Sequence, residues 1–147
     1  MDENRPLTLE FKRAEIPAMR FVTNFIKREF SLDLTPIQCE IFIILKENGE
    51  PIIQSELQQR LDVSKSTLSG VLQTMQKNDY IKKSVCETDK RISMISLTDH
   101  GLKVYDDVVA RFDELDRVIF KGLNDDQLSI LREAFVMIRH NIGSDPE

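Results

Sequence analysis

Residues 55–98 read SELQQRLDVSKSTLSGVLQTMQKNDYIKKSVCETDKRISMISLT. The apolar pair Leu57 and Leu61 predicts a short helix of about two turns. A turn follows this pair, and Ser64, a residue type that caps helix starts, begins a longer helix. The first half of the stretch therefore predicts two helices joined by a tight turn.

The second half of the stretch has an extended pattern. Residues 81–86 and 92–97 are rich in β-branched side chains, and the polar segment 87–91 separates them. This arrangement predicts a β-hairpin with a five-residue tip. A short helix, a turn, a second helix and a hairpin, in that order, form a winged helix-turn-helix.

The longer helix has two different faces at about 100° per residue. Its apolar side chains share one face: Leu68, Val71, Leu72 and Met75. The opposite face carries small polar and basic side chains, which can donate hydrogen bonds to phosphates and base edges. Free backbone N–H groups in the first turn also suit a phosphate. From this helix we expect the following DNA contacts: Ser64, Lys65, Ser66, Thr67, Ser69, Gln73 and Lys77.

The charge of the chain is unevenly distributed. The formal net charge is −5, which by itself argues against a polyanionic partner. Residues 55–98 are nevertheless net +2, whereas residues 1–54 are net −2 and residues 99–147 are net −5. Residues 63–78 contain no Asp or Glu. The acidic total therefore does not exclude a local phosphate-facing surface.

Further helices are predicted before this stretch. Thr35-Pro36-Ile37-Gln38 combines a cap, a proline at the first helical position and a capping-box glutamine, and Asn48-Gly49 ends that helix. Ile52-Ile53 predicts a minimal strand. Pro17 argues against one regular helix through residues 7–30. We therefore expect a helix from about Pro17 to Phe30, preceded by a separate short arm that carries Leu7, Leu9 and Phe11. The side chains of that helix expected to face inward are Val22, Phe25, Ile26 and Phe30.

Two long helices are predicted after the hairpin. Thr98 caps the first, and Asn124 with Gln127 opens the second. The apolar residues of the second helix repeat at intervals of 3, 4, 3 and 4, as in a heptad seam: Leu128, Leu131, Phe135, Ile138 and Ile142. The apolar faces of the two long helices are wider than a small winged motif needs to cover its own core. They therefore favour a dimer, although packing of the two helices on each other accounts for part of these faces.

Several of these residues resemble a known signature. Asp89-Lys90-Arg91, followed by Leu97-Thr98 and Gly101, is similar to the D-x-R…L-T-x-x-G pattern of the MarR family of bacterial winged-helix regulators. Ser64-Lys65-Ser66-Thr67 and Tyr80-Ile81 resemble the start of the family's recognition helix and the entry to its wing. The resemblance covers about residues 17–142.

The resemblance implies a mainly α fold with a small β-hairpin wing, in a single domain over residues 1–143. The helix-turn-helix then spans about 54–78 and the wing about 81–97. The dimerisation helices span about 17–30 and 99–142. A homodimer built from the terminal helices of both subunits is the implied assembly.

The resemblance also implies roles for residues of the wing. Arg91 enters the DNA minor groove, where negative potential attracts arginine, and Asp89 orients it through a charge-assisted hydrogen bond. Lys90 completes the DNA-binding tip. The family often has glycine where this chain has Asp79, and arginine where it has Gly70. Base reading is therefore expected from Gln73, Ser69 and Lys65.

We expect a cytoplasmic transcriptional regulator that binds a pseudo-palindromic, double-stranded operator as a homodimer. Repression released by a small-molecule effector or another signal is the behaviour that the family suggests. Two alternatives remain open at this point. One is a winged-helix protein-interaction module that uses the acidic helices without binding DNA, and the other is a regulator that responds to oxidants through Cys39 or Cys86.

An effector pocket is a further expectation. Four residues are candidates to line it between the dimer helices and the winged motif: Phe21, Phe25, Cys39 and Phe42. The alternative for these side chains is the hydrophobic core, and for both cysteines it is a buried structural role.

Other functional classes lack support in the sequence. No phosphate-binding glycine loop or nucleophile elbow occurs, so we expect no enzyme and no cofactor. His100 and His140 have no ligand partners at metal-binding spacing, so we expect no metal. No run of 18 apolar residues occurs, and the chain opens with acidic residues, so we expect neither a membrane span nor a secretory signal.

Overall fold

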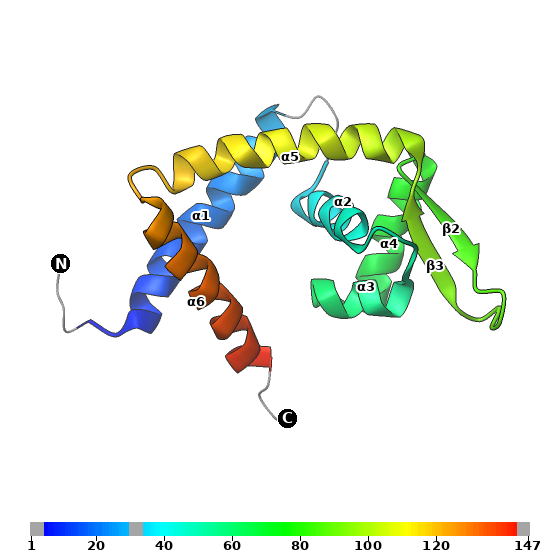
Figure 1. The fold of residues 1–147 in the computed structure, drawn as a ribbon, viewed down its shortest axis with the longest axis horizontal. Helices are drawn as coiled ribbons and strands as arrows, with labels where there is room; N and C mark the ends of the chain where they lie inside the picture. The colour runs from blue at the N-terminus through cyan, green and yellow to red at the C-terminus, as the bar shows by residue number, and fades with distance from the viewer. Residues whose placement is uncertain (1–4, 30–33, 144–147) are drawn as a thin grey trace. The chain divides into compact units, whose positions relative to one another are not determined.

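The computed structural model describes residues 5–29 and 34–143 (Figure 1). The chain divides into two compact units, Met1–Asp113 and Glu114–Glu147, and the single domain expected over residues 1–143 spans both. The elements follow in the order α1 (Leu7–Glu29), α2 (Pro36–Asn48), β1 (Ile52–Ile53), α3 (Gln54–Leu61), α4 (Lys65–Lys77), β2 (Ile81–Val85), β3 (Ser93–Leu97), α5 (Asp99–Ile119) and α6 (Asp125–Gly143). The expected mainly α fold with a small β wing is confirmed.

Capping residues set the helix boundaries where the sequence predicts them. The Thr35 backbone N–H donates to Gln38 Oε1 at 2.9 Å, and the Gln38 N–H donates to Thr35 Oγ1 at 3.4 Å, which completes the capping box of α2. Gly49 then ends α2 with a φ of 71°. Asn124 and Gln127 form the same reciprocal pair before α6, with distances of 2.9 and 3.0 Å. These local hydrogen bonds satisfy N–H groups that a helix start leaves free.

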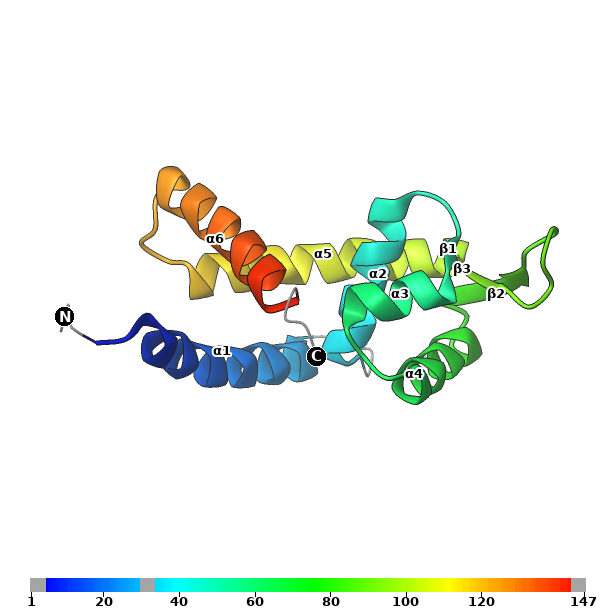
Figure 2. The same cartoon turned by 90° about the horizontal axis from the view of Figure 1, so that it is seen from below.

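The three strands form one antiparallel sheet in the order β1-β3-β2. Ile52 pairs with Ile95, and Ile81 pairs with Leu97, so the two-residue strand β1 joins the hairpin to the helices. An isolated two-stranded hairpin is marginally stable in water. Figure 1 and Figure 2 show the tip of β2 and β3 projecting away from α2, α3 and α4.

The core of the first unit lies among α2, α4, the sheet and the first part of α5. Phe42 of α2, Leu72 of α4, Ile95 of β3 and Val108 of α5 belong to one buried cluster. On α4, Leu68, Leu72 and Met75 are buried and Val71 is half-buried, which confirms the predicted apolar face. Near the end of α1, Phe25 and Ile26 are buried, as predicted.

The expected break of the first helix at Pro17 is wrong. Helix α1 runs through Pro17 from Leu7 to Glu29, so the residues assigned to a separate arm are helical. A proline removes one N–H bond and costs about 3 kcal/mol, but the residues on both sides are mostly good helix formers and continue the helix. Phe30, which the same prediction placed inward, lies outside the described residues.

Helix α4 ends at a left-handed aspartate. Asp79 has a φ of 58°, the Tyr80 N–H donates to the Met75 carbonyl at 2.9 Å, and the Asp79 N–H donates to the Gln76 carbonyl at 3.0 Å. These two bonds form a Schellman motif, in which glycine is the usual left-handed residue. Asp79 therefore takes the conformation that the resemblance assigns to a glycine, at some steric cost.

The same turn meets the start of α5. The Thr98 N–H donates to the Tyr80 carbonyl at 3.1 Å, and the Thr98 hydroxyl donates to the Asp79 carbonyl. The Gly101 N–H donates to Thr98 Oγ1 at 2.9 Å. A Cβ at position 101 would lie 2.0 Å from the Tyr80 carbonyl oxygen. Only glycine fits this approach without movement of the backbone.

We expect Gly101→Ala to lower the free energy of unfolding by about 2–3 kcal/mol, because the added methyl group must displace the Tyr80 peptide. Urea denaturation at fixed protein concentration, followed by circular dichroism, measures this change. Gly70→Ala is the matched control, since a Cβ there meets nothing within 4 Å. In a helix that change stabilises by about 0.5–1 kcal/mol. Equal stability of the Gly101 variant and the natural protein would contradict the close packing.

Candidate nucleic-acid interface

The first turn of α4 is organised by Ser64. Its Oγ accepts from the Thr67 backbone N–H at 3.1 Å and lies 2.8 Å from Thr67 Oγ1 and 3.2 Å from Ser66 Oγ. Ser64, Lys65, Ser66 and Thr67 are all exposed. The hydroxyl of Ser64 is therefore engaged in fixing the turn, while Lys65 and the remaining backbone N–H groups face solvent.

The polar face of α4 lies opposite its buried face. Ser66, Gly70, Gln73 and Lys77 are exposed and Ser69 is half-buried. This arrangement matches the angular prediction. A helix with donor side chains and no carboxylate on its exposed face can make hydrogen bonds to phosphates and to base edges.

The tip of the wing holds Arg91 in a fixed orientation. Arg91 Nε and Nη2 each lie 3.2 Å from the carboxylate of Asp89, and the Arg91 backbone N–H donates to Asp89 Oδ1 at 3.0 Å. Hydrogen bonds from the Arg91 side chain lower the pKa of the Asp89 carboxyl. The Arg91 side chain remains 90% exposed. Two of its five N–H groups bond to Asp89, which leaves three for a partner.

A cleft of about 340 Å³ brings the wing and α4 together. Lys65, at the start of α4, and Arg91, between β2 and β3, both line it. The remaining lining residues come from β1, α3 and the start of β3: Ile53, Gln54, Ser55, Gln58, Ile92 and Ser93. Two cations and several hydrogen-bonding side chains in one cleft suit a phosphate group.

Gln54, Ser55 and Gln58 also line the cleft, although no sequence pattern predicted them as site residues. These residues belong to α3, which begins after Ile53 with no side-chain cap. The uncapped N–H groups were a signal, because the first turn of a helix attracts anions. Eight other predicted contacts do not line this cleft: Ser64, Ser66, Thr67, Ser69, Gln73, Lys77, Asp89 and Lys90.

The candidates for an effector pocket lie mainly in the core. Cys39 and Phe42 are fully buried, Phe25 is buried, and Phe21 is 39% exposed with its ring centroid 6.4 Å from that of Phe25. Burial raises the pKa of the Cys39 thiol to about 12. Within this structure Cys39 and Phe42 can meet a ligand only if the core opens.

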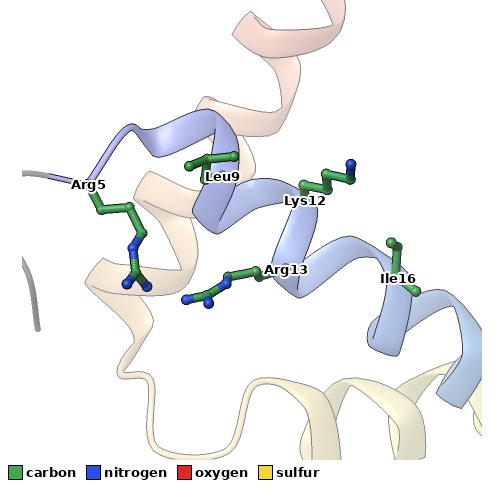
Figure 3. A pocket seen from close by; sticks show the side chains of 5 residues that line it. All are labelled: Arg5, Leu9, Lys12, Arg13 and Ile16. Carbon is green, nitrogen blue, oxygen red and sulfur yellow. The ribbon is translucent and has the colours of Figure 1, made fainter.

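A separate hollow of about 460 Å³ lies along α1 and contains none of the predicted site residues. Its lining consists of Arg5, Leu9, Lys12, Arg13 and Ile16, shown in Figure 3. The carboxylate of Glu10 lies 3.0 Å from Arg5 and 3.9 Å from Arg13. Two of the three cations of this hollow are therefore already paired.

Residues 5–29 and 34–143 contain no candidate metal site and no candidate membrane-spanning helix. No group of three His, Cys, Asp or Glu side chains there could hold a metal ion. No helix in the same residues is long and apolar enough to cross a membrane.

Comparison with known proteins agrees with this geometry. Residues 32–92 match the model of the MarR family. The HTH-type transcriptional repressor IacR of Pseudomonas putida is 24% identical over 144 residues, which cover 93% of this chain and 86% of IacR. AbsC, a MarR family transcriptional regulator from Streptomyces coelicolor, has the same fold, with a TM-score of 0.83, 22% identity, and coverage of 99% of this chain and 97% of AbsC.

A mutant of MarR from E. coli complexed with operator DNA also has this fold. The TM-score is 0.75 and the identity 19%, over 93% of this chain and 96% of that chain. The family match covers both helices of the helix-turn-helix and the wing tip with Arg91. The family model, the curated relative and the shared fold all make this chain similar to the MarR family of winged helix-turn-helix transcriptional regulators.

Proposed function

We propose that the protein binds double-stranded DNA with sequence specificity and thereby regulates transcription. The observation that carries the proposal is the shared cleft of Lys65 and Arg91 at the junction of α4 and the wing. These two cations come from elements that a winged helix-turn-helix presents to the major groove and to the neighbouring backbone or minor groove. A phosphate in the cleft positions α4 for base contacts.

Helix α4 is the proposed recognition helix. Gln73 is exposed on its outer face, and a glutamine side chain can pair with the two hydrogen-bonding groups of adenine in the major groove. Ser69 and Lys65 are the other proposed base contacts. Ser66, Thr67 and Lys77 are proposed to contact the backbone, which fixes the register without reading sequence.

Arg91 is the proposed minor-groove contact, with Asp89 as its positioning residue and Lys90 beside it. Two hydrogen bonds from the Arg91 side chain to Asp89 already restrict its rotamers. The arginine therefore loses less conformational freedom when it binds. A narrow minor groove concentrates negative potential and attracts an exposed guanidinium.

A homodimer is the proposed assembly, built from the terminal helices. Leu7, at the start of α1, is 85% exposed, and none of the described residues of α6 is buried. Exposed apolar surface of this kind marks interaction sites. Two-fold symmetry places two recognition helices about 34 Å apart, one turn of duplex, on a pseudo-palindromic operator.

We further propose that the protein represses transcription in the cytoplasm and that a small-molecule signal releases it from the operator. The relative IacR is named a transcriptional repressor, which supports this direction of regulation. A ligand that binds the DNA-free state more tightly would release the operator by shifting the population toward that state.

We expect Arg91→Ala to weaken binding of the operator about tenfold or more, because a charge-assisted contact to the duplex is lost. The slope of log affinity against log salt should fall by about 0.9 for each phosphate that the arginine neutralises. Fluorescence anisotropy titrations at several salt concentrations measure both quantities, using a duplex selected from genomic fragments.

Three variants separate the parts of this surface. Lys46→Ala removes a cation of the same unit outside the cleft and should change neither quantity; its ammonium lies 5.8 Å from the Tyr105 ring centroid. Arg91→Lys keeps the charge but loses the fork, so it should retain most of the salt slope. Gln73→Ala should relax base preference at one position. If Arg91→Ala and Gln73→Ala both leave the affinity unchanged, the assigned surface is wrong.

For the alternative of a redox response, the surroundings of Cys86 give more support than those of Cys39. Cys86 is half-buried where β2 passes into the tip of the wing, with its Sγ 3.1 Å from Thr88 Oγ1. This hydrogen bond lowers the pKa of the Cys86 thiol. The reactive form of cysteine is the thiolate, which a lowered pKa favours and a raised pKa suppresses.

We expect a disulfide reagent at neutral pH to modify one thiol of the folded protein quickly and the second only after unfolding. Absorbance of the released thiolate follows both phases. The fast phase should disappear in Cys86→Ser and remain in Cys39→Ser. Equal rates for the two thiols in the folded protein would show that Cys39 is not shielded.

A further inference from the structure

Gly70 interrupts the exposed face of α4 in the middle of the helix. Helix α4 is continuous from Lys65 to Lys77, and Figure 2 shows it at the outer edge of the first unit. Glycine inside a helix costs stability relative to alanine, because glycine loses more conformational freedom on folding. A glycine at such a position therefore calls for a reason, either in the fold or in a partner.

The fold gives no reason for this glycine. Gly49 and Gly122 have positive φ, which favours glycine, and Gly101 closely approaches the Tyr80 carbonyl. Gly70 shows neither feature. Its φ is not positive, and a Cβ at this position meets nothing within 4 Å in the part of the chain that the structure describes. The chain itself would therefore accept alanine here, and the missing side chain leaves room for a group from outside the chain.

The gap at Gly70 lies among donor side chains but has no side-chain donor of its own. Ser66, Gln73 and Lys77 share this side of α4 and are exposed. Thr74, one turn beyond the gap, is also exposed, but its hydroxyl donates to the Gly70 carbonyl at 3.2 Å and so bonds within the helix. The gap therefore suits an apolar group that protrudes from a partner, while the donors beside it suit polar atoms of the same partner.

We propose that Gly70 is a specificity-determining residue whose gap receives the C5-methyl group of a thymine in the operator. This inference rests on the proposed DNA binding and names one base that α4 reads. In the major groove of unmodified DNA, the thymine methyl group is the apolar group of the base edges, whereas the other groups donate or accept hydrogen bonds. Burial of this methyl group against the helix backbone favours an A·T pair opposite Gly70 in each half-site.

Polar parts of a duplex do not suit the same gap. A phosphate oxygen or an acceptor atom of a base would lose hydrogen bonds to water there without gaining a donor. An amino group of a base would meet the Gly70 carbonyl. That carbonyl already accepts from the helix backbone and from the Thr74 hydroxyl, so both of its lone pairs are engaged.

The first test separates stability from binding. We expect Gly70→Ala to raise the midpoint of thermal unfolding, because alanine favours a helix. The same change should weaken binding of the duplex selected from genomic fragments about tenfold, because the new methyl group takes the space of the thymine methyl group. A loss of affinity in a more stable variant cannot come from unfolding. Fluorescence anisotropy measures the affinity, and an unchanged value would overturn the proposal.

Gly143→Ala is the matched control for this substitution. Gly143 is the last residue of α6, outside the helix-turn-helix and the wing, and a Cβ there also meets nothing within 4 Å among the described residues. This variant should bind the duplex as the natural protein does. An equal loss of affinity in both variants would show that the effect does not arise at the face of α4, and the proposal would be rejected.

The second test identifies the base. Each thymine of a chemically synthesised copy of the duplex is replaced in turn by deoxyuridine, which lacks only the C5-methyl group. For the natural protein we expect one position in each half-site at which the replacement weakens binding about fourfold, as burial of one methyl-sized group implies. For Gly70→Ala the preference at that position should disappear or reverse, because the alanine methyl group occupies the gap.

The outcomes distinguish this inference from the proposed function. A thymine preference that is lost in Gly70→Ala and kept in Gly143→Ala supports the inference. If the natural protein binds the duplex but no thymine position responds differently in Gly70→Ala, the gap does not receive a thymine and the inference is overturned while the proposed function stands. If no duplex is bound more tightly than non-specific DNA, the proposed function fails and this inference fails with it.

Discussion

One backbone carbonyl fixes the geometry on which the proposed DNA-binding surface depends. The oxygen of Tyr80 accepts from the Thr98 N–H at 3.1 Å and occupies the space where a side chain at position 101 would begin. Tyr80 stands between α4 and β2, and Thr98 stands between β3 and α5. The joint therefore ties together the end of the helix that carries Gln73 and both strands of the hairpin that carries Arg91. Because Ile81 pairs with Leu97 directly beyond it, the direction of the wing follows from this contact.

The left-handed turn at Asp79 belongs to the same joint. Three residues separate the end of α4 at Lys77 from the start of β2 at Ile81, so the chain must reverse abruptly. The two Schellman hydrogen bonds and the Thr98 hydroxyl bond to the Asp79 carbonyl hold this reversal. An aspartate with positive φ is disfavoured by local sterics, and these bonds offset the cost. Residues far apart in the chain, Lys65 and Arg91, can then line one cleft.

Local signals predicted most of the elements, and non-local features were missed. The caps at Thr35, Ser64 and Asn124 act within four residues, so their hydrogen bonds can be anticipated from sequence alone. The predicted helix break at Pro17 was wrong because it considered the local cost of the proline without the helix propensity of the residues around it. Gln54, Ser55 and Gln58 carry no periodic signal that marks a site, and only the folded positions of β1, α3 and the wing bring them beside Arg91. The resemblance anticipated the fork between Asp89 and Arg91, whereas its closeness to Lys65 required the fold.

The distribution of charge explains how an acidic chain can still present a surface that suits a polyanion. Arg91 is forked to Asp89 and 90% exposed, with a second cation across a polar cleft. Such a surface suits a phosphate backbone, whose groups are hydrated and repeat along a strand. Arg117, Lys121 and Arg132 instead line a groove within residues 114–147, a segment rich in carboxylates. That segment as a whole repels a polyanion, because its carboxylates outnumber its cations. The surroundings of each cationic group, more than the net charge of −5, therefore determine which anion it can bind.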